Sequence, residues 1–128
     1  MRAVDTNVLV RLLARDDQKQ AAAAESFVAD GAWVSHLVLA ETTWVLSAVF
    51  SRSSLQIAEA IAQLLEHEAL AVQDSDVVGF ALAHLRRKPA LGFSDCLILE
   101  VARKAGHLPL GTFDRDLGRL DGVSKLKG

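Results

Sequence analysis

The sequence predicts an α/β fold built around a mainly parallel sheet. Short apolar segments that suit strands alternate with longer segments whose apolar residues recur at helical spacing. The order is β-α-α-β-α-α-β-α-α-β, which is typical of a three-layer α/β/α sandwich around four to five strands. The 128 residues, of which 51% are apolar and 23% charged, fit one globular domain spanning residues 1–128.

The first third of the chain supplies one strand and two helices. Residues 2–5 form the first predicted strand, in which Ala3 and Val4 precede the acid, and apolar residues at helical spacing follow at once. Asp16 or Asp17 can cap the next, alanine-rich helix. That helix is expected to end at Asp30-Gly31, because glycine commonly terminates helices.

The middle third repeats this pattern. Residues 33–35 form a short predicted strand, and Ser35 is expected to cap a helix that runs to about Phe50. Ser53 and Gln56 have the spacing of a capping box, which predicts another helix. Residues 70–73 then form the third strand.

The last third is predicted in the same way. Asp74 is expected to cap one helix, and Ser94 is expected to cap a second helix that ends before Gly106. Residues 109–113 form the next strand, and residues 123–126 can add an edge strand after a turn.

Composition narrows the class of protein. No apolar run approaches the roughly 20 residues that span a bilayer, and the start lacks an apolar stretch of signal-peptide length. The single cysteine, Cys96, excludes an internal disulfide and fits a reducing compartment, so we expect a cytoplasmic protein without a membrane partner. A net charge of −2 argues against a general nucleic-acid coating protein but leaves a nuclease open.

Four acidic residues occupy places where an unpartnered carboxylate is unfavourable. Asp5 and Asp114 follow predicted strands, Asp95 lies at a helix start, and Glu41 lies in a helix among apolar neighbours. Because ligands bind outside the carboxyl ends of parallel strands, these positions favour a shared site for a divalent metal ion. Taken alone, Asp5 and Asp114 are as readily explained as cap or turn residues, and Asp95 is more readily explained as an acid in the first turn of a helix.

Among the four acids, Glu41 gives the clearest sequence evidence for a functional carboxylate. The residues three and four positions away on its helix are Leu37, Val38, Trp44 and Val45. We expect this apolar stripe to face the core, and we separately expect Trp33 and Trp44 to be core residues rather than surfaces for base stacking. A solvated glutamate is expected instead on the other face, near Thr42 and Thr43, although a stripe-edge glutamate can also reach water.

Clustered carboxylates repel one another and therefore require cations or protons. Mg²⁺ or Mn²⁺ suits them, because hard oxygen ligands select hard cations over zinc. Four polar neighbours can orient the ligands or contact a phosphate, although capping and turn roles explain them almost equally well. These are Thr6, Asn7, Ser94 and Thr112.

Four short motifs, in order, carry a resemblance to a known family. They are Val4-Asp5-Thr6-Asn7-Val8-Leu9, Val38-Leu39-Ala40-Glu41, Phe93-Ser94-Asp95-Cys96-Leu97-Ile98 and Thr112-Phe113-Asp114-Arg115-Asp116-Leu117. The chain resembles a PIN domain, and more closely the VapC-type toxins of bacterial and archaeal toxin–antitoxin pairs. Ser94 stands where many relatives carry alanine.

The resemblance implies an endoribonuclease dependent on Mg²⁺ or Mn²⁺ that acts on RNA. It implies that Asp5, Glu41, Asp95 and Asp114 are the catalytic and metal-binding acids. It also implies a homodimer and a cognate antitoxin protein whose tail enters the site. Asp116 is a possible fifth acid, and Asp114 is preferred because it directly follows the predicted strand.

Cations can supply contacts to an RNA backbone, and Arg115 is the best placed because it adjoins the acidic site. Further candidates are Arg11, Arg15, Arg86, Arg87 and Lys88. Loop charges are more often simply solvated. Cys96 lacks an adjacent histidine, so we interpret it as a buried structural thiol and not as a nucleophile.

Three alternatives remain. A phospho-receiver domain is disfavoured because residues 33–35 end without the aspartate that accepts phosphate. A haloacid-dehalogenase-like phosphatase is disfavoured because Asp5-Thr6-Asn7 lacks the second aspartate of its motif. The third alternative is a PIN domain that binds RNA or protein without cutting.

Overall fold

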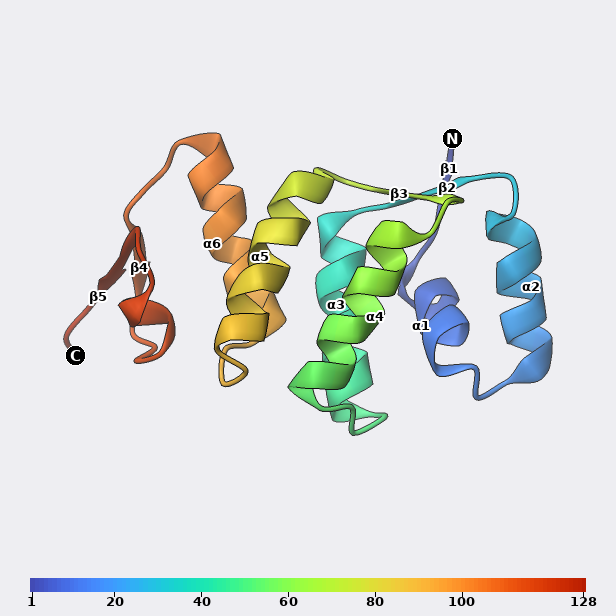
Figure 1. Cartoon of the computed structure of the whole chain (residues 1–128), viewed down its shortest axis with the longest axis horizontal. Helices are drawn as coiled ribbons and strands as arrows, with labels where there is room; N and C mark the ends of the chain where they lie inside the picture. Colours follow the sequence, from blue (N-terminus) through green and yellow to red (C-terminus); the bar gives the residue numbers. More distant parts are fainter. The chain divides into compact units, whose positions relative to one another are not determined.

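The computed structural model describes all residues, 1–128, and its contacts group them into two compact units, Met1–Ser75 and Asp76–Gly128. Figure 1 shows the course of the chain through its helices and strands. The α/β class with parallel strands is confirmed, and so is the predicted order of strands and helices. No helix is both long and apolar enough to cross a bilayer.

The first unit contains a three-stranded parallel sheet in the order β1-β2-β3. Its strands are β1 (Arg2–Ala3), β2 (Ala32–Val34) and β3 (Leu70–Val72). The helices α1 (Thr6–Ala14) and α2 (Gln18–Val28) connect β1 to β2, and α3 (His36–Ala48) and α4 (Ser54–Glu66) connect β2 to β3. Because the strands are parallel, their carboxyl ends lie at one edge of the sheet, from which α1 and α3 begin.

Short polar side chains start these helices. Asp17 caps α2, Ser35 caps α3, and Ser53 with Gln56 forms the predicted capping box of α4. The apolar faces behind the caps form the core of the unit. Its most deeply buried side chains include Leu9, Val34, Leu39 and Ile61.

The second unit contains α5 (Ser75–Arg87), which begins at the boundary, α6 (Phe93–Ala105) and a two-stranded parallel sheet. That sheet pairs β4 (Leu110–Thr112) with β5 (Val123–Lys125), and the short 3-10 helix η1 (Leu117–Arg119) lies between them in sequence. The five strands thus form two hydrogen-bonded sheets, of three and two strands. Gly106 ends α6 with a φ of +84°, the left-handed conformation expected of a terminating glycine.

Ser94 does not cap α6, contrary to expectation. Gly92 occupies the N-cap position without a side-chain hydrogen bond, and the helix starts at Phe93, which is buried. Asp74 directly precedes α5, at the position predicted for its cap, and has a left-handed φ of +40°.

Candidate functional site

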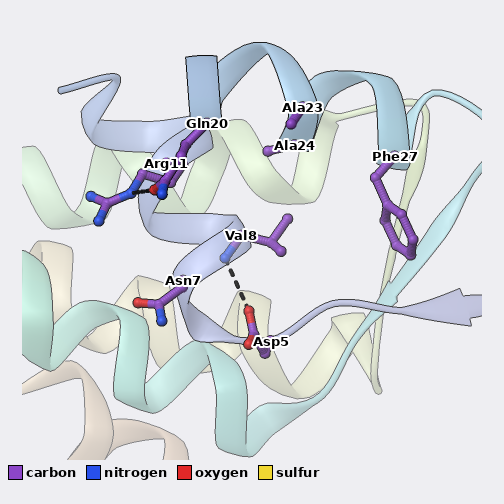
Figure 2. Close-up of a pocket in the computed structure, with 8 residues that line it drawn as sticks. All are labelled: Asp5, Asn7, Val8, Arg11, Gln20, Ala23, Ala24 and Phe27. Carbon is purple, nitrogen blue, oxygen red and sulfur yellow. Dashed lines mark hydrogen bonds between the residues drawn. The ribbon is translucent and has the colours of Figure 1, made fainter. Parts of the chain in front are cut away.

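Asp5 lies just after β1 and caps α1. Its backbone is extended, with φ of −96° and ψ of −178°, and its Oδ1 accepts a hydrogen bond of 3.1 Å from the backbone N–H of Val8 (Figure 2). The capping role is therefore real. The side chain is nevertheless exposed, and an ionised carboxylate can accept several bonds, so capping leaves it able to bind a cation. Asn7, two residues on, is also exposed.

Thr6 brings α1 and α3 together at Glu41. The Thr6 hydroxyl is buried and donates a short hydrogen bond to Oε1 of Glu41. This bond fixes one carboxylate oxygen of Glu41 relative to the turn that carries Asp5. Thr6 thus contacts one of the candidate acids directly through its side chain.

The predicted orientation of α3 was wrong. Glu41 is exposed, and its apolar neighbours Leu37 and Trp44 are 79% and 65% exposed, so the stripe that contains them does not face the core. Thr42 and Thr43, expected at the surface, are buried instead. Glu41 is therefore a solvent-accessible acid beside apolar residues.

Asp95 lies in the first turn of α6 and is half-buried. Burial raises its pKa above the usual value of 3.8, and the negative charge of Asp114 raises that pKa further. Within the second unit the structure therefore brings these two candidate acids within electrostatic reach. Ser94 precedes Asp95 in the same turn and is also half-buried.

Asp114 ends a tight turn after β4. Its Oδ2 accepts a hydrogen bond of 2.7 Å from the N–H of Leu117, and its own N–H donates to Oγ1 of Thr112 at 3.0 Å. The sequence allowed both a turn role and a ligand role for Asp114, and the turn role is confirmed. The bond to its hydroxyl gives Thr112 a part in holding the Asp114 backbone.

Asp116 and Arg115 differ in their surroundings. Oδ1 of Asp116 lies 3.5 Å from Nζ of Lys88, so this acid already has a cation beside it. That ion pair supports Asp114 over Asp116 as the acid of the site. Arg115 follows Asp114 directly and is exposed.

Cys96 adjoins Asp95 but is buried. Burial raises the pKa of its thiol to about 11, and the charge of Asp95 adds to the shift. The thiol is thus protonated at neutral pH and unsuited to nucleophilic attack. The interpretation of Cys96 as a structural thiol is confirmed.

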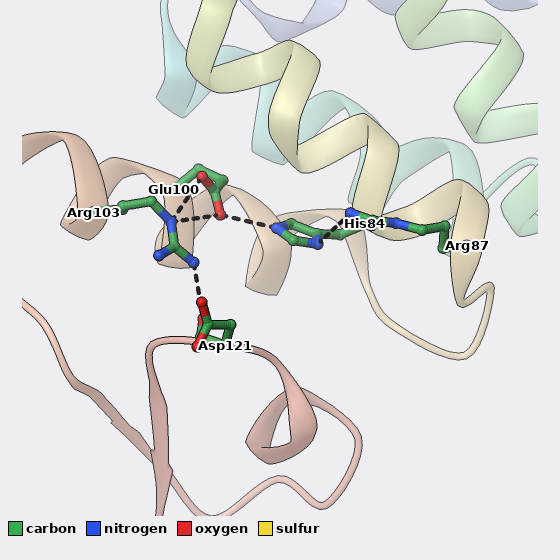
Figure 3. Close-up of polar contacts among 5 residues, drawn as sticks. All are labelled: His84, Arg87, Glu100, Arg103 and Asp121. Atoms are coloured by element: carbon green, nitrogen blue, oxygen red, sulfur yellow. Dashed lines mark hydrogen bonds and ion pairs between the residues drawn. The ribbon is translucent and has the colours of Figure 1, made fainter.

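Sequence reasoning missed a buried carboxylate, Glu100, which is 4% exposed (Figure 3). Its Oε2 lies 2.9 Å from Nε2 of His84, and its Oε1 accepts from Nε of Arg103 at 3.2 Å. Glu100 follows Cys96 and Leu97 by four and three positions. The argument applied to Glu41, that an acid with apolar neighbours on its helix is buried, would therefore have identified Glu100. For Glu100 that argument gives the right answer.

Neither unit alone gathers three or more histidine, cysteine, aspartate or glutamate side chains in position to hold a metal ion. What the structure shows is two separate local arrangements. One joins Asp5, Thr6 and Glu41 in the first unit, and the other joins Asp95 and Asp114 in the second.

Comparison with known proteins gives one result on the family. Neither a curated protein nor a solved structure matches the chain significantly. The family model described as PIN domain matches residues 2–123, nearly the whole chain, and all the candidate acids lie inside that range. The chain belongs to the PIN-domain family.

Proposed function

We propose that this protein is an endoribonuclease that hydrolyses RNA phosphodiesters with the help of Mg²⁺ or Mn²⁺, and that residues 1–128 act as a single PIN domain. PIN domains are generally nucleases, they typically use divalent metal ions, and PIN nucleases bind RNA. The observation that carries the proposal is the raised pKa of Asp95, which is caused first by burial of the side chain and then by repulsion from the negative charge of Asp114. A divalent cation would relieve that repulsion.

The donor set fits a hard cation. We propose that Asp5, Glu41, Asp95 and Asp114 together hold the ion, because all four supply carboxylate oxygens, whereas the Cys96 thiol beside Asp95 is buried and protonated. When bound, the ion would activate water and neutralise charge that builds on the phosphodiester. The raised pKa of Asp95 supports this assignment, since a ligand carboxylate without its cation holds its proton more tightly.

The chain's own residues have distinct parts in the proposed reaction. The cap that Asp5 makes with Val8 and the hydrogen bond from Thr6 to Glu41 hold two carboxylates before substrate arrives. One of the four acids accepts the proton of the attacking water as general base. Arg115, exposed beside Asp114, contacts a phosphate oxygen of the RNA. The products are a 5′-phosphate and a 3′-hydroxyl.

We further propose that the protein is the toxin of a toxin–antitoxin pair, that it acts in the cytoplasm, and that it forms a homodimer. The sequence resemblance to VapC-type toxins supports the first of these, together with the inhibition by an antitoxin that it implies. The single reduced cysteine supports the second. Leu37 and Trp44, exposed on the same side of α3, supply apolar surface suited to a subunit interface.

A PIN domain that binds without cutting is the competing function. The test is cleavage of total cellular RNA by purified, antitoxin-free protein with Mg²⁺, with Mn²⁺ or with EDTA. Asp5→Asn removes a proposed ligand and retains a capping side chain. Asp17→Asn is the matched control, because Asp17 makes the same kind of cap on α2 outside the acidic set.

We expect discrete, metal-dependent products from the wild type and from Asp17→Asn, and none from Asp5→Asn. Metal binding without cleavage of any RNA would favour the non-cutting alternative. Products ending in 2′,3′-cyclic phosphate would instead identify the RNA 2′-hydroxyl as the nucleophile and contradict the hydrolytic mechanism. If the wild-type protein binds neither Mg²⁺ nor Mn²⁺, the role given to the four acids is contradicted.

A further inference from the structure

A cavity of about 450 Å³ lies between α1 and α2 and has Asp5 in its wall (Figure 2). All of its lining residues belong to the first unit. Its size falls in the range of sites for small molecules. None of the roles described so far accounts for this cavity.

One part of the cavity wall is apolar. Val8 of α1 faces the α2 residues Ala23, Ala24 and Phe27, and the two alanines project only a methyl group each. The guanidinium of Arg2 lies 3.9 Å from the centre of the Phe27 ring, and Arg2 also donates to the Phe27 carbonyl at 2.9 Å. Phe27 is thereby held in place, which suits a flat aromatic ligand.

The rest of the lining is polar and lies in two places: Arg11 and Gln20 contact each other, and Asn7 lies near Asp5 at the start of α1 (Figure 2). Asn7 and Gln20 contribute side-chain amides, and Arg11 contributes a guanidinium. Nε of Arg11 donates a hydrogen bond to Oε1 of Gln20. Because that bond uses the Gln20 oxygen, the Gln20 NH₂ group is the part of the amide that can donate to a ligand. NH1 of Arg11 also pairs with Asp16 at 2.9 Å, so much of its charge is neutralised.

We propose that this cavity binds the base of an RNA nucleotide next to the phosphodiester that is cut. Amide donors and acceptors above an apolar floor suit the polar edge and flat face of a base. A bare phosphate is less suited, because Asp16 neutralises Arg11 and Asp5 adds a negative charge to the wall. Since Asp5 belongs to both the wall and the proposed metal site, the bound base would set which phosphate is cut.

This inference rests on the proposed nuclease function, so its test needs a readout that does not depend on cleavage. Nuclear magnetic resonance can follow the side-chain amide signals of Asn7 and Gln20 while AMP, GMP, CMP and UMP are added in turn, without metal. Ala23→Leu fills the cavity from an exposed helical position. Ala22→Leu is the matched control, because Ala22 is exposed on the same helix and does not line the cavity.

We expect at least one nucleotide to shift both amide signals in the wild type and in Ala22→Leu. We expect Ala23→Leu to weaken that binding at least tenfold. In RNA cleavage, Ala23→Leu should raise KM or change the cleavage sites, and kcat on saturating RNA should change much less. Gln20→Leu, which removes the donor without filling the cavity, should alter the base preference.

Absence of any shift, or equal shifts in Ala23→Leu and Ala22→Leu, would overturn the nucleotide pocket. Shifts caused by a cognate antitoxin but by no nucleotide would assign the cavity to a protein side chain and overturn it as well. If nucleotides bind as expected but no RNA is cut with either metal, the pocket stands and the nuclease proposal fails. If Ala23→Leu and Ala22→Leu cut RNA identically, the nuclease proposal stands and the pocket proposal fails.

Discussion

The hydroxyl of Thr6 donates a hydrogen bond to Oε1 of Glu41, 35 positions further along the chain. Thr6 is buried at the start of α1, whereas Glu41 is exposed near the middle of α3. The buried Thr6 hydroxyl therefore positions the Glu41 carboxylate and leaves it accessible to solvent. This contact makes Glu41 a fixed group rather than a freely rotating surface side chain.

Thr6→Val should separate positioning from packing, because valine keeps the branched shape and lacks the donor. We expect kcat for RNA cleavage to fall about tenfold, with a loss of about 1 kcal/mol in the free energy of unfolding. Thr6→Ser keeps the hydroxyl and should retain most of the activity. Equal activity in Thr6→Val and the wild type would show that Glu41 needs no orientation from Thr6.

Asp5 has a structural role beside its proposed catalytic one, and two substitutions distinguish them. Asp5→Ala removes the cap on α1 and should cost about 1 kcal/mol in the free energy of unfolding, whereas Asp5→Asn should cost only a few tenths. Both should abolish cleavage. Denaturant unfolding without metal, paired with an RNA assay, measures both quantities. Strong destabilisation by Asp5→Asn would instead make the role of Asp5 mainly structural.

Local rules predicted most of the fold. The caps at Asp17, Ser35 and Ser53 and the glycine end at Gly106 lie where side-chain chemistry placed them. Ser94 does not cap α6 because the helix starts two residues earlier than predicted, at the buried Phe93. Burial of a large aromatic side chain thus outweighed a local preference.

The face of α3 could not be predicted from apolar spacing, because α3 carries apolar residues around most of its circumference. Thr42 and Thr43 are buried because their hydroxyls donate to the carbonyls of Val38 and Ala40 at 2.7 and 2.8 Å. Satisfied in this way, a threonine packs much like an aliphatic residue. The sequence predicted where the four acids lie relative to the strands and helices. It did not predict their hydrogen-bond partners, because these depend on how the helices pack.

The raised pKa of Asp95 predicts a dependence of stability on pH. Below the usual aspartate pKa of 3.8 the carboxyl is protonated in both states and has no effect. Between that value and the raised pKa the folded state holds the proton more tightly, so stability falls as the pH rises. Above the raised pKa the destabilisation is complete.

Asp95→Asn should therefore have a higher Tm than the wild type at pH 7 in EDTA and an equal Tm near pH 3. Asp114→Asn keeps an acceptor for the Leu117 N–H and should also raise the Tm at pH 7, because it removes the charge facing Asp95. Added Mg²⁺ should raise the Tm of the wild type more than that of either variant. A lower Tm for Asp95→Asn at pH 7 in EDTA would show that the charged form is stabilised in the folded protein.

The thiol of Cys96 should be unreactive in the folded protein. With a pKa raised to about 11 by burial, roughly one molecule in a thousand carries the thiolate at pH 8. Ellman's reagent should therefore label no thiol in native protein over minutes and one thiol per chain in guanidinium. Rapid labelling of native protein would mean that α6 opens readily around Cys96.

Glu100 makes the strongest stability prediction, because its buried carboxylate serves both His84 and Arg103. Glu100→Ala should lower the free energy of unfolding by about 3 kcal/mol, since it leaves polar and charged partners without their acceptor. Glu25→Ala removes an acid from a surface ion pair with Arg15 and should change stability by less than about 1 kcal/mol. Urea unfolding of the two variants measures the contrast. Equal losses would mean that the network in Figure 3 contributes no more than an exposed ion pair.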